Sequence, residues 1–119
     1  MKKAICVFCA AEKLSDRIWF KNNYFYVLKN HNPIAQGHCM VIPYRHIREE
    51  IELNAKEWRS YLDVCEWTVT NIYKQYRKDA LVFINAPSDQ SVFHLHKHYI
   101  PSGGLFGKLK VEGAIRKLT

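Results

Sequence analysis

The sequence predicts a single α+β domain in which one long helix covers an antiparallel sheet. Three observations support this fold class: a length of 119 residues, a helical apolar repeat near the middle, and strand-like runs on both sides of it. With 48% hydrophobic and 13% aromatic residues, a chain of this size can bury an apolar core without disulfides. No internal repeat or composition shift marks a boundary, so we expect one domain over residues 1–119.

Two strand-like runs near the N-terminus predict a β-hairpin. Residues 18–20 and 24–28 are rich in aromatic and β-branched side chains, and the Lys-Asn-Asn segment at 21–23 favours a turn. After a polar loop, residues 38–42 predict a third strand. Pro43 closes this strand because proline lacks the N–H group that a sheet ladder needs.

A long amphipathic helix is predicted after the third strand. Asn54 suits the N-cap, and Glu57 follows at the spacing of a capping box. Apolar side chains then recur at helical spacing up to about residue 78, namely Trp58, Tyr61, Leu62, Cys65, Val69, Ile72 and Tyr76. Residues 80–85 and 91–100 predict two further strands joined by a turn-rich link. The total is about five strands and one helix.

Composition bounds the partners and the compartment. The formal net charge of +7 favours an anionic partner, but the basic residues are scattered, so nucleic acid is not the favoured partner.

No apolar run approaches the roughly 18 residues of a membrane span. The basic start and the apolar run 4–11 imitate a secretory signal but lack a cleavage site, so we expect a cytoplasmic protein. A glycine-rich basic tail, residues 102–119, follows the motif-bearing core, residues 1–101.

Three histidines at every second residue, His94, His96 and His98, form the most informative segment of the chain. On a strand such side chains share a face about 6.5–7 Å apart, so one phosphate-sized group can touch neighbouring rings. Polar rings on such a face need hydrogen bonds, a metal or a ligand. His38, directly after Gly37, would add a fourth imidazole if its strand lies nearby.

Neutral imidazole suits nucleophilic attack on phosphorus. Its reference pKa of about 6.5 leaves the neutral form dominant at physiological pH, and a protonated neighbouring ring can stabilise phosphoryl oxygens. Ser91 lies on the same alternation as the triplet, and Gln90 with nearby backbone N–H groups can donate hydrogen bonds to an anion. The alternatives are buried histidines satisfied by the core, and a three-histidine metal centre that would give two metal ions per chain.

The histidine segment and its companion resemble the histidine-triad (HIT) family of nucleotide hydrolases and transferases. The resemblance rests on residues 37–43 (GHCMVIP) with His46 and on residues 90–101 (QSVFHLHKHYIP), and it covers roughly residues 5–101. It implies a HIT-like sheet with a covering helix and a nucleotide substrate, with a purine nucleoside phosphate expected. It also implies that His96 attacks the α-phosphorus and forms a nucleotidyl-histidine intermediate, which water hydrolyses.

The resemblance assigns further side chains to parts of the nucleotide. These are His38, His98, Ser91 and Gln90 for the phosphate or the leaving group, Asn30 for the ribose, and Asn85 for ordering the phosphate loop. Among the apolar residues, Ile5 and Phe8 are expected to contact the purine. Two departures from the family pattern stand out. Lys97 replaces an apolar residue and is expected to reach solvent or an anion, and the loop 85–90 is shorter than the glycine-rich loop of the family. The tail after Pro101 carries no family motif, so the sequence does not define the preferred leaving group.

A second constellation, Cys6 and Cys9, has the spacing of two zinc ligands. The resemblance implies that His46 and His94 complete a structural zinc site, which would tie the N-terminal segment to the histidine triplet. The alternatives are a redox pair, although no thioredoxin-like βαβ pattern surrounds it, and two free structural cysteines. Cys65 is expected in the core.

Besides an enzyme with a three-histidine metal centre, three functions remain compatible with the sequence. The first is a nucleotidyl hydrolase or transferase that releases a nucleoside monophosphate from phosphoramidate-type conjugates through His96. The second is a dinucleoside polyphosphate hydrolase, which would favour a longer basic groove. The third is a non-catalytic nucleotide-binding protein stabilised by zinc. In each case we expect a homodimer, because small antiparallel sheets protect their edges by pairing.

Overall fold

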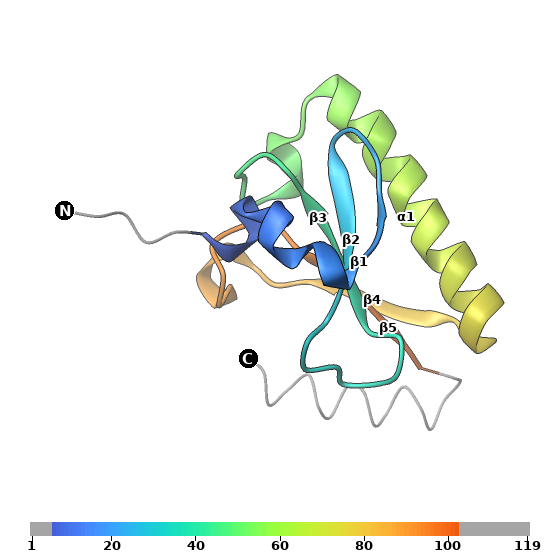
Figure 1. The fold of residues 1–119 in the computed structure, drawn as a ribbon. Coiled ribbons are helices and arrows are strands. Elements are labelled where there is room, and N and C mark those ends of the chain that lie inside the picture. Colours follow the sequence, from blue (N-terminus) through green and yellow to red (C-terminus); the bar gives the residue numbers. More distant parts are fainter. Residues whose placement is uncertain (1–5, 103–119) are drawn as a thin grey trace.

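One twisted antiparallel sheet with a long helix on one face forms the centre of the molecule (Figure 1). The computed structural model describes residues 6–102. Its helix is α1 (Ala55–Tyr76), and its strands are β1 (Ile18–Lys21), β2 (Phe25–Lys29), β3 (Cys39–Pro43), β4 (Ala80–Ile84) and β5 (Lys97–Pro101). All neighbours in the order β1-β2-β3-β5-β4 are antiparallel. The predicted α+β class, five strands and covering helix are confirmed.

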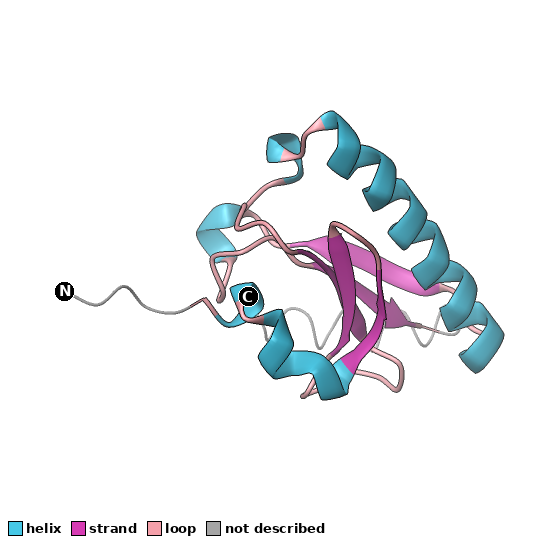
Figure 2. Ribbon diagram, turned by 45° about the horizontal axis from the view of Figure 1, so that its top comes forward, coloured by secondary structure: helices cyan, strands magenta, loops and turns pink. Residues whose placement is uncertain are grey.

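Alternation along the strands gives the sheet two apolar layers. Val27 and Val41 face α1 and pack with buried helix residues such as Val64. Leu28 and Met40 face the other side, where they meet the short helices η1 (Val7–Cys9) and η2 (Ala11–Arg17). Figure 2 shows α1 and these N-terminal turns on opposite faces of the sheet. The N-terminal segment therefore closes the face that α1 leaves open.

Helix α1 begins where the sequence predicts. The Glu57 N–H donates to Asn54 Oδ1 at 2.9 Å, and the Asn54 N–H donates to Glu57 Oε1 at 3.0 Å, which completes the capping box. The buried side is Glu57, Tyr61, Val64, Thr68 and Ile72. Leu62 and Val69, by contrast, are 65% and 47% exposed. They are rotated away from the sheet, so part of the apolar repeat lies on the outer face.

The predicted strand over residues 91–100 is shorter than expected. Pairing in β5 begins only at Lys97. Upstream, the Leu95 N–H donates to the Ile47 carbonyl at 2.6 Å and the His94 N–H to the Val92 carbonyl at 2.8 Å. These backbone groups bond to loops, so the first two histidines of the triplet lie outside the strand. Leu95 still packs in the layer that faces α1.

No helix within residues 6–102 is long and apolar enough to cross a bilayer. The sequence-based predictions for Ile5 and for tail positions 103–119 lie outside the described residues.

Candidate active site and metal centre

A cavity of about 390 Å³ lies on the face of the sheet opposite α1. Its walls come from the N-terminal turns, β2, the loop before β3, and the segment after β4. Seven of the residues that the sequence assigns to catalysis or nucleotide binding line it together: Phe8, Asn30, His38, Asn85, Ser91, His96 and His98. The fold thus gathers side chains that are up to 90 positions apart.

Backbone hydrogen bonding fixes the tautomer of His96. Its Nδ1–H donates to the His94 carbonyl at 2.7 Å, which leaves Nε2 as the nitrogen with a free lone pair. The ring is 5% exposed, and burial lowers its pKa below the usual value. His96 therefore offers an unprotonated nitrogen to a ligand in the cavity at neutral pH.

A relay of hydrogen bonds fixes His98 in the opposite tautomer. The Ile34 N–H donates to His38 Nδ1 at 3.2 Å, so His38 carries its proton on Nε2 and donates it to His98 Nδ1 at 2.9 Å. His98 must then carry its own proton on Nε2. Its ring stacks on Phe83 with the centroids 4.5 Å apart. The relay makes His98 a neutral hydrogen-bond donor beside the lone pair of His96.

Burial keeps both relay histidines uncharged. Desolvation lowers the pKa of His38 to about 4, and desolvation followed by the charges of His96 and His38 lowers that of His98 to about 3. A protonated ring beside the phosphate, which the sequence analysis allowed, is therefore not favoured at neutral pH. The relay also occupies both ring nitrogens of His38, so His38 orients His98.

Gly37 sets the position of His38. Its φ of +92° lies in the region that favours glycine, and an added Cβ would approach the Tyr76 ring to 2.5 Å. The close approach at this glycine is made by the Tyr76 side chain at the end of α1. The His38 N–H then donates to the Ala35 carbonyl at 3.0 Å, which closes the turn.

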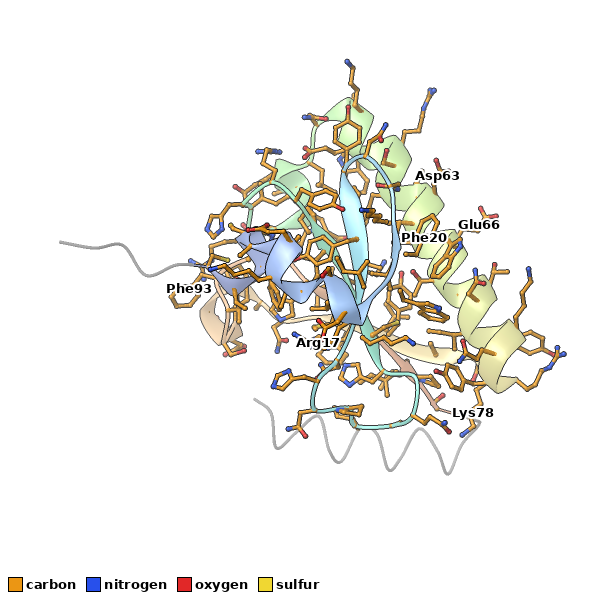
Figure 3. All side chains as sticks on the ribbon, viewed as in Figure 1. Arg17, Phe20, Asp63, Glu66, Lys78 and Phe93 are labelled. Carbon is orange, nitrogen blue, oxygen red and sulfur yellow. The ribbon has the colours of Figure 1, made fainter. Side chains whose placement is uncertain are left out.

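One side of the cavity suits a nucleoside. Leu28 and Met40 from the sheet and Phe8 from η1 together provide an apolar wall. Asn30 follows β2, with its amide nitrogen 3.4 Å from His38 Nε2. Arg17 also lines this side and donates from Nη1 to the Lys29 carbonyl at 3.0 Å (Figure 3). No sequence pattern singles out Arg17, because it is an isolated basic residue at the end of a short helix.

Gln90 does not line the cavity. Its Nε2 donates to the Arg48 carbonyl at 2.9 Å, and its Oε1 accepts from Arg48 Nε at 3.1 Å. Arg48 also lies over the Phe93 ring, 4.6 Å from its centroid. Gln90 therefore anchors the short loop, whereas its neighbour Asp89 enters the cavity wall. No sequence pattern singles out Asp89, because it stands in a short polar loop whose path only the fold defines.

The four predicted metal ligands come together beside the cavity. Donor atoms of Cys6, Cys9, His46 and His94 all lie within 4.8 Å of one another. His94 donates from Nε2 to the Pro43 carbonyl at 2.7 Å, so its unprotonated Nδ1 faces the cluster. From Nδ1, Cys6 Sγ is 3.4 Å away and His46 Nδ1 3.2 Å.

The chemistry of this cluster fits a zinc ion. Two sulfurs and two ring nitrogens are the donors that tetrahedral zinc prefers. Burial, and then the hydrogen bond and charge of Cys6, raise the pKa of Cys9, and a bound cation would offset that repulsion. Phe8 sits between the two cysteines and contacts both His94 and His96, with centroids 6.0 and 5.2 Å away. Metal binding would therefore fix one wall of the cavity.

The position of Lys97 differs from the sequence-based prediction. Its ammonium lies over the rings of Tyr61 and Tyr99, at 5.0 and 5.5 Å from their centroids, and 3.6 Å from Cys65 Sγ. The side chain extends between β5 and α1 because alternation turns it away from the histidines. It is held by aromatic faces.

The chain is similar to known proteins over most of its length. The family model of the HIT domain matches residues 11–104. Bis(5'-adenosyl)-triphosphatase of Saccharomyces cerevisiae is 29% identical over 92 residues, which are 74% of this chain and 45% of that protein. The chain therefore spans less than half the length of this relative.

Solved structures share the fold. A HIT family protein from Bacillus subtilis superposes with a TM-score of 0.74 at 20% identity, covering 94% of this chain and 95% of the other. A Zn-bound histidine triad family protein from Mycobacterium smegmatis gives a TM-score of 0.67 at 20% identity, covering 95% and 94%.

Proposed function

Because the chain belongs to the HIT domain family, we propose that it is a nucleotidyl hydrolase or transferase with His96 as its nucleophile. The observation that carries the proposal is the hydrogen bond from His96 Nδ1 to the His94 carbonyl. It leaves Nε2 unprotonated in a cavity that also holds the N–H donor of His98. A nucleophile and an adjacent donor for the phosphoryl oxygens are the two groups that the reaction requires.

The proposed substrate is a nucleoside phosphoramidate or related conjugate. His96 Nε2 attacks the α-phosphorus, and the electron pair of the breaking P–N bond leaves with the amine, which takes a proton from solvent. Water then attacks phosphorus, and the electron pair of the P–Nε2 bond returns to His96. The attacking water releases one proton to solvent, which replaces the proton that the amine took up. The products are a nucleoside monophosphate and an amine.

The surrounding residues act on binding and orientation in this proposal. His98 donates from Nε2 to a phosphoryl oxygen, and His38 is a positioning residue that holds His98. Ser91, exposed at the cavity edge, contacts the phosphate or the leaving group. Asn30 contacts the ribose, while Phe8 with its apolar neighbours contacts a purine.

The charges that line the cavity favour a phosphoramidate. Among the described lining residues the side chains with a fixed charge are Arg17 and Asp89, so the net fixed charge of the wall is zero, and the relay histidines are neutral. A polyphosphate carries several negative charges and would need cationic partners that this wall does not supply. Hydrolysis of dinucleoside polyphosphates is the second candidate, favoured by the yeast triphosphatase relative.

Zinc and a second copy of the chain complete the proposal. Cys6, Cys9, His46 and His94 would hold structural zinc, and a Zn-bound histidine triad family protein with this fold supports a zinc site. The four free thiols suit a reducing, cytoplasmic compartment. A homodimer would cover the edge strand β4 together with the exposed helix residues Trp58 and Leu62. Sedimentation tests the dimer: Leu62→Glu should yield a monomer, and a monomeric parent would contradict pairing.

Release of AMP tests the proposed reaction. We expect the parent protein to release AMP from adenosine phosphoramidate faster than from diadenosine triphosphate, and His96→Ala to release none. Faster cleavage of the triphosphate would establish the second candidate function. An active His96→Ala variant would contradict the assignment of the nucleophile.

A further inference from the structure

The order of the strands divides the cavity into two sides around the histidines. Leu28 pairs with Met40, and Met40 pairs with His98, so the nucleoside side lies about two strand spacings, or roughly 10 Å, from His98. On the other side of β5 lies β4, and the segment that follows β4 carries Asp89 and Ser91 into the wall. A nucleotide with its base on the β2 side therefore presents its leaving group to this segment.

Asp89 brings an uncompensated charge to the leaving-group side. It is exposed and ends the short helix η4 (Pro87–Asp89). Within residues 6–102 its carboxylate has no hydrogen-bond or ion-pair partner. The basic residue bonded to the same loop, Arg48, is committed to Gln90 and to the Pro87 carbonyl. The other cation of the wall, Arg17, is held on the nucleoside side by the Lys29 carbonyl.

This arrangement discriminates between leaving groups by charge. A carboxylate beside the departing group repels an anion such as a second phosphate and attracts an ammonium. The neutral histidines offer no cation that would mask it. We propose that Asp89 is a specificity-determining residue that selects conjugates whose leaving amine bears a further positive charge. This inference rests on the proposed function, because the leaving amine that Asp89 would attract is the group that His96 displaces.

Two matched substrates test the inference. One is the adenosine phosphoramidate of a diaminoalkane, with a free terminal ammonium, and the other is that of a neutral alkylamine of equal length. The parent protein should show a kcat/KM about fivefold higher for the cationic substrate at low salt, the upper range for an exposed ion pair. Added salt should reduce the ratio, since the Debye length falls to about 3 Å at 1 M.

Charge variants identify the residue responsible. Asp89→Asn should bring the ratio of the two kcat/KM values to about one. Asp63→Asn, which removes a carboxylate from the outer part of α1, far from the cavity, should retain the ratio of the parent (Figure 3). A ratio near one in the parent, or an unchanged ratio in Asp89→Asn, would overturn the inference.

A binding measurement separates this inference from the proposed reaction. Calorimetric titration of both phosphoramidates into His96→Ala needs no turnover, and the cationic ligand should bind about fivefold more tightly. The additional change Asp89→Asn should equalise the two dissociation constants. If the parent hydrolyses neither compound while this preference appears and is lost with Asp89, the reaction is wrong and the charge selection stands. Equal binding to His96→Ala contradicts the charge selection alone.

Discussion

At the scale of single residues, three backbone groups decide what the histidines can do. The carbonyls of His94 and Pro43 each accept one ring N–H, and the Ile34 N–H caps another ring. As a result His96 and His94 expose lone pairs, one toward the cavity and one toward the metal ligands. Sequence spacing predicts which histidines form the site, but it does not predict their tautomers, because those depend on which backbone groups each ring meets in the folded chain.

Buried neutral histidines make stability depend on pH. The pKa of His38 is about 4 in the folded protein against the usual 6.5, so between these values the unfolded chain binds a proton that the folded chain lacks. The free energy of unfolding should therefore fall as pH decreases from about 6.5 toward 4. The slope from His38 is at most about 1.4 kcal/mol per pH unit.

Urea denaturation across this pH range measures the effect. His38→Asn should show a shallower loss of stability on acidification, whereas His31→Asn, a change in an exposed loop residue, should keep the slope of the parent. Zinc release at low pH affects all three proteins and cancels in the comparison. An unchanged slope in His38→Asn would show that His38 is not held neutral.

At the scale of elements, the sequence is informative where a local rule and the core agree. The capping box at Asn54, the hairpin and the first three strands are confirmed within one or two residues. The prediction of a strand over residues 91–100 is wrong in its first half, since the Leu95 N–H donates to the carbonyl of Ile47 in a loop. Gln90 is likewise turned to Arg48, a contact between segments 42 positions apart that periodicity does not reveal.

The contact between Gly37 and α1 gives a prediction at this scale. Gly37→Ala should destabilise the protein by about 1–2 kcal/mol from its left-handed backbone alone, with an added cost from the Tyr76 ring. Because the same turn positions His38, the substitution should also lower kcat. Urea midpoints measure the stability change, with Gln36→Ala as the control in the same loop. A midpoint equal to that of the parent would contradict the required close approach.

At the scale of the whole molecule, the metal cluster joins three distant segments. Cys6 and Cys9 come from the N-terminal turns, His46 from the loop after β3, and His94 from the segment before β5. Spacing predicts the cysteine pair from sequence, but the two histidine ligands require the family resemblance or the fold. The cluster and the cavity share Phe8, so zinc would stabilise the fold and the active site together.

Loss of one thiol should remove the metal and the stability that it provides. Cys9→Ser is expected to lower zinc content, measured by atomic emission, and the melting temperature in parallel. A chelator should lower the melting temperature of the parent but not of the variant. Cys65→Ser, which changes a thiol beside Lys97, should retain zinc. A metal-replete parent without zinc would contradict the proposed metal site.

The most direct test of the central claim is the intact mass of the protein after rapid, acid-free quenching with adenosine phosphoramidate. We predict a nucleotidyl adduct on the parent protein and none on His96→Ala, since the bond forms at His96 Nε2. An adduct of equal yield on both proteins would place the covalent bond elsewhere and contradict the account.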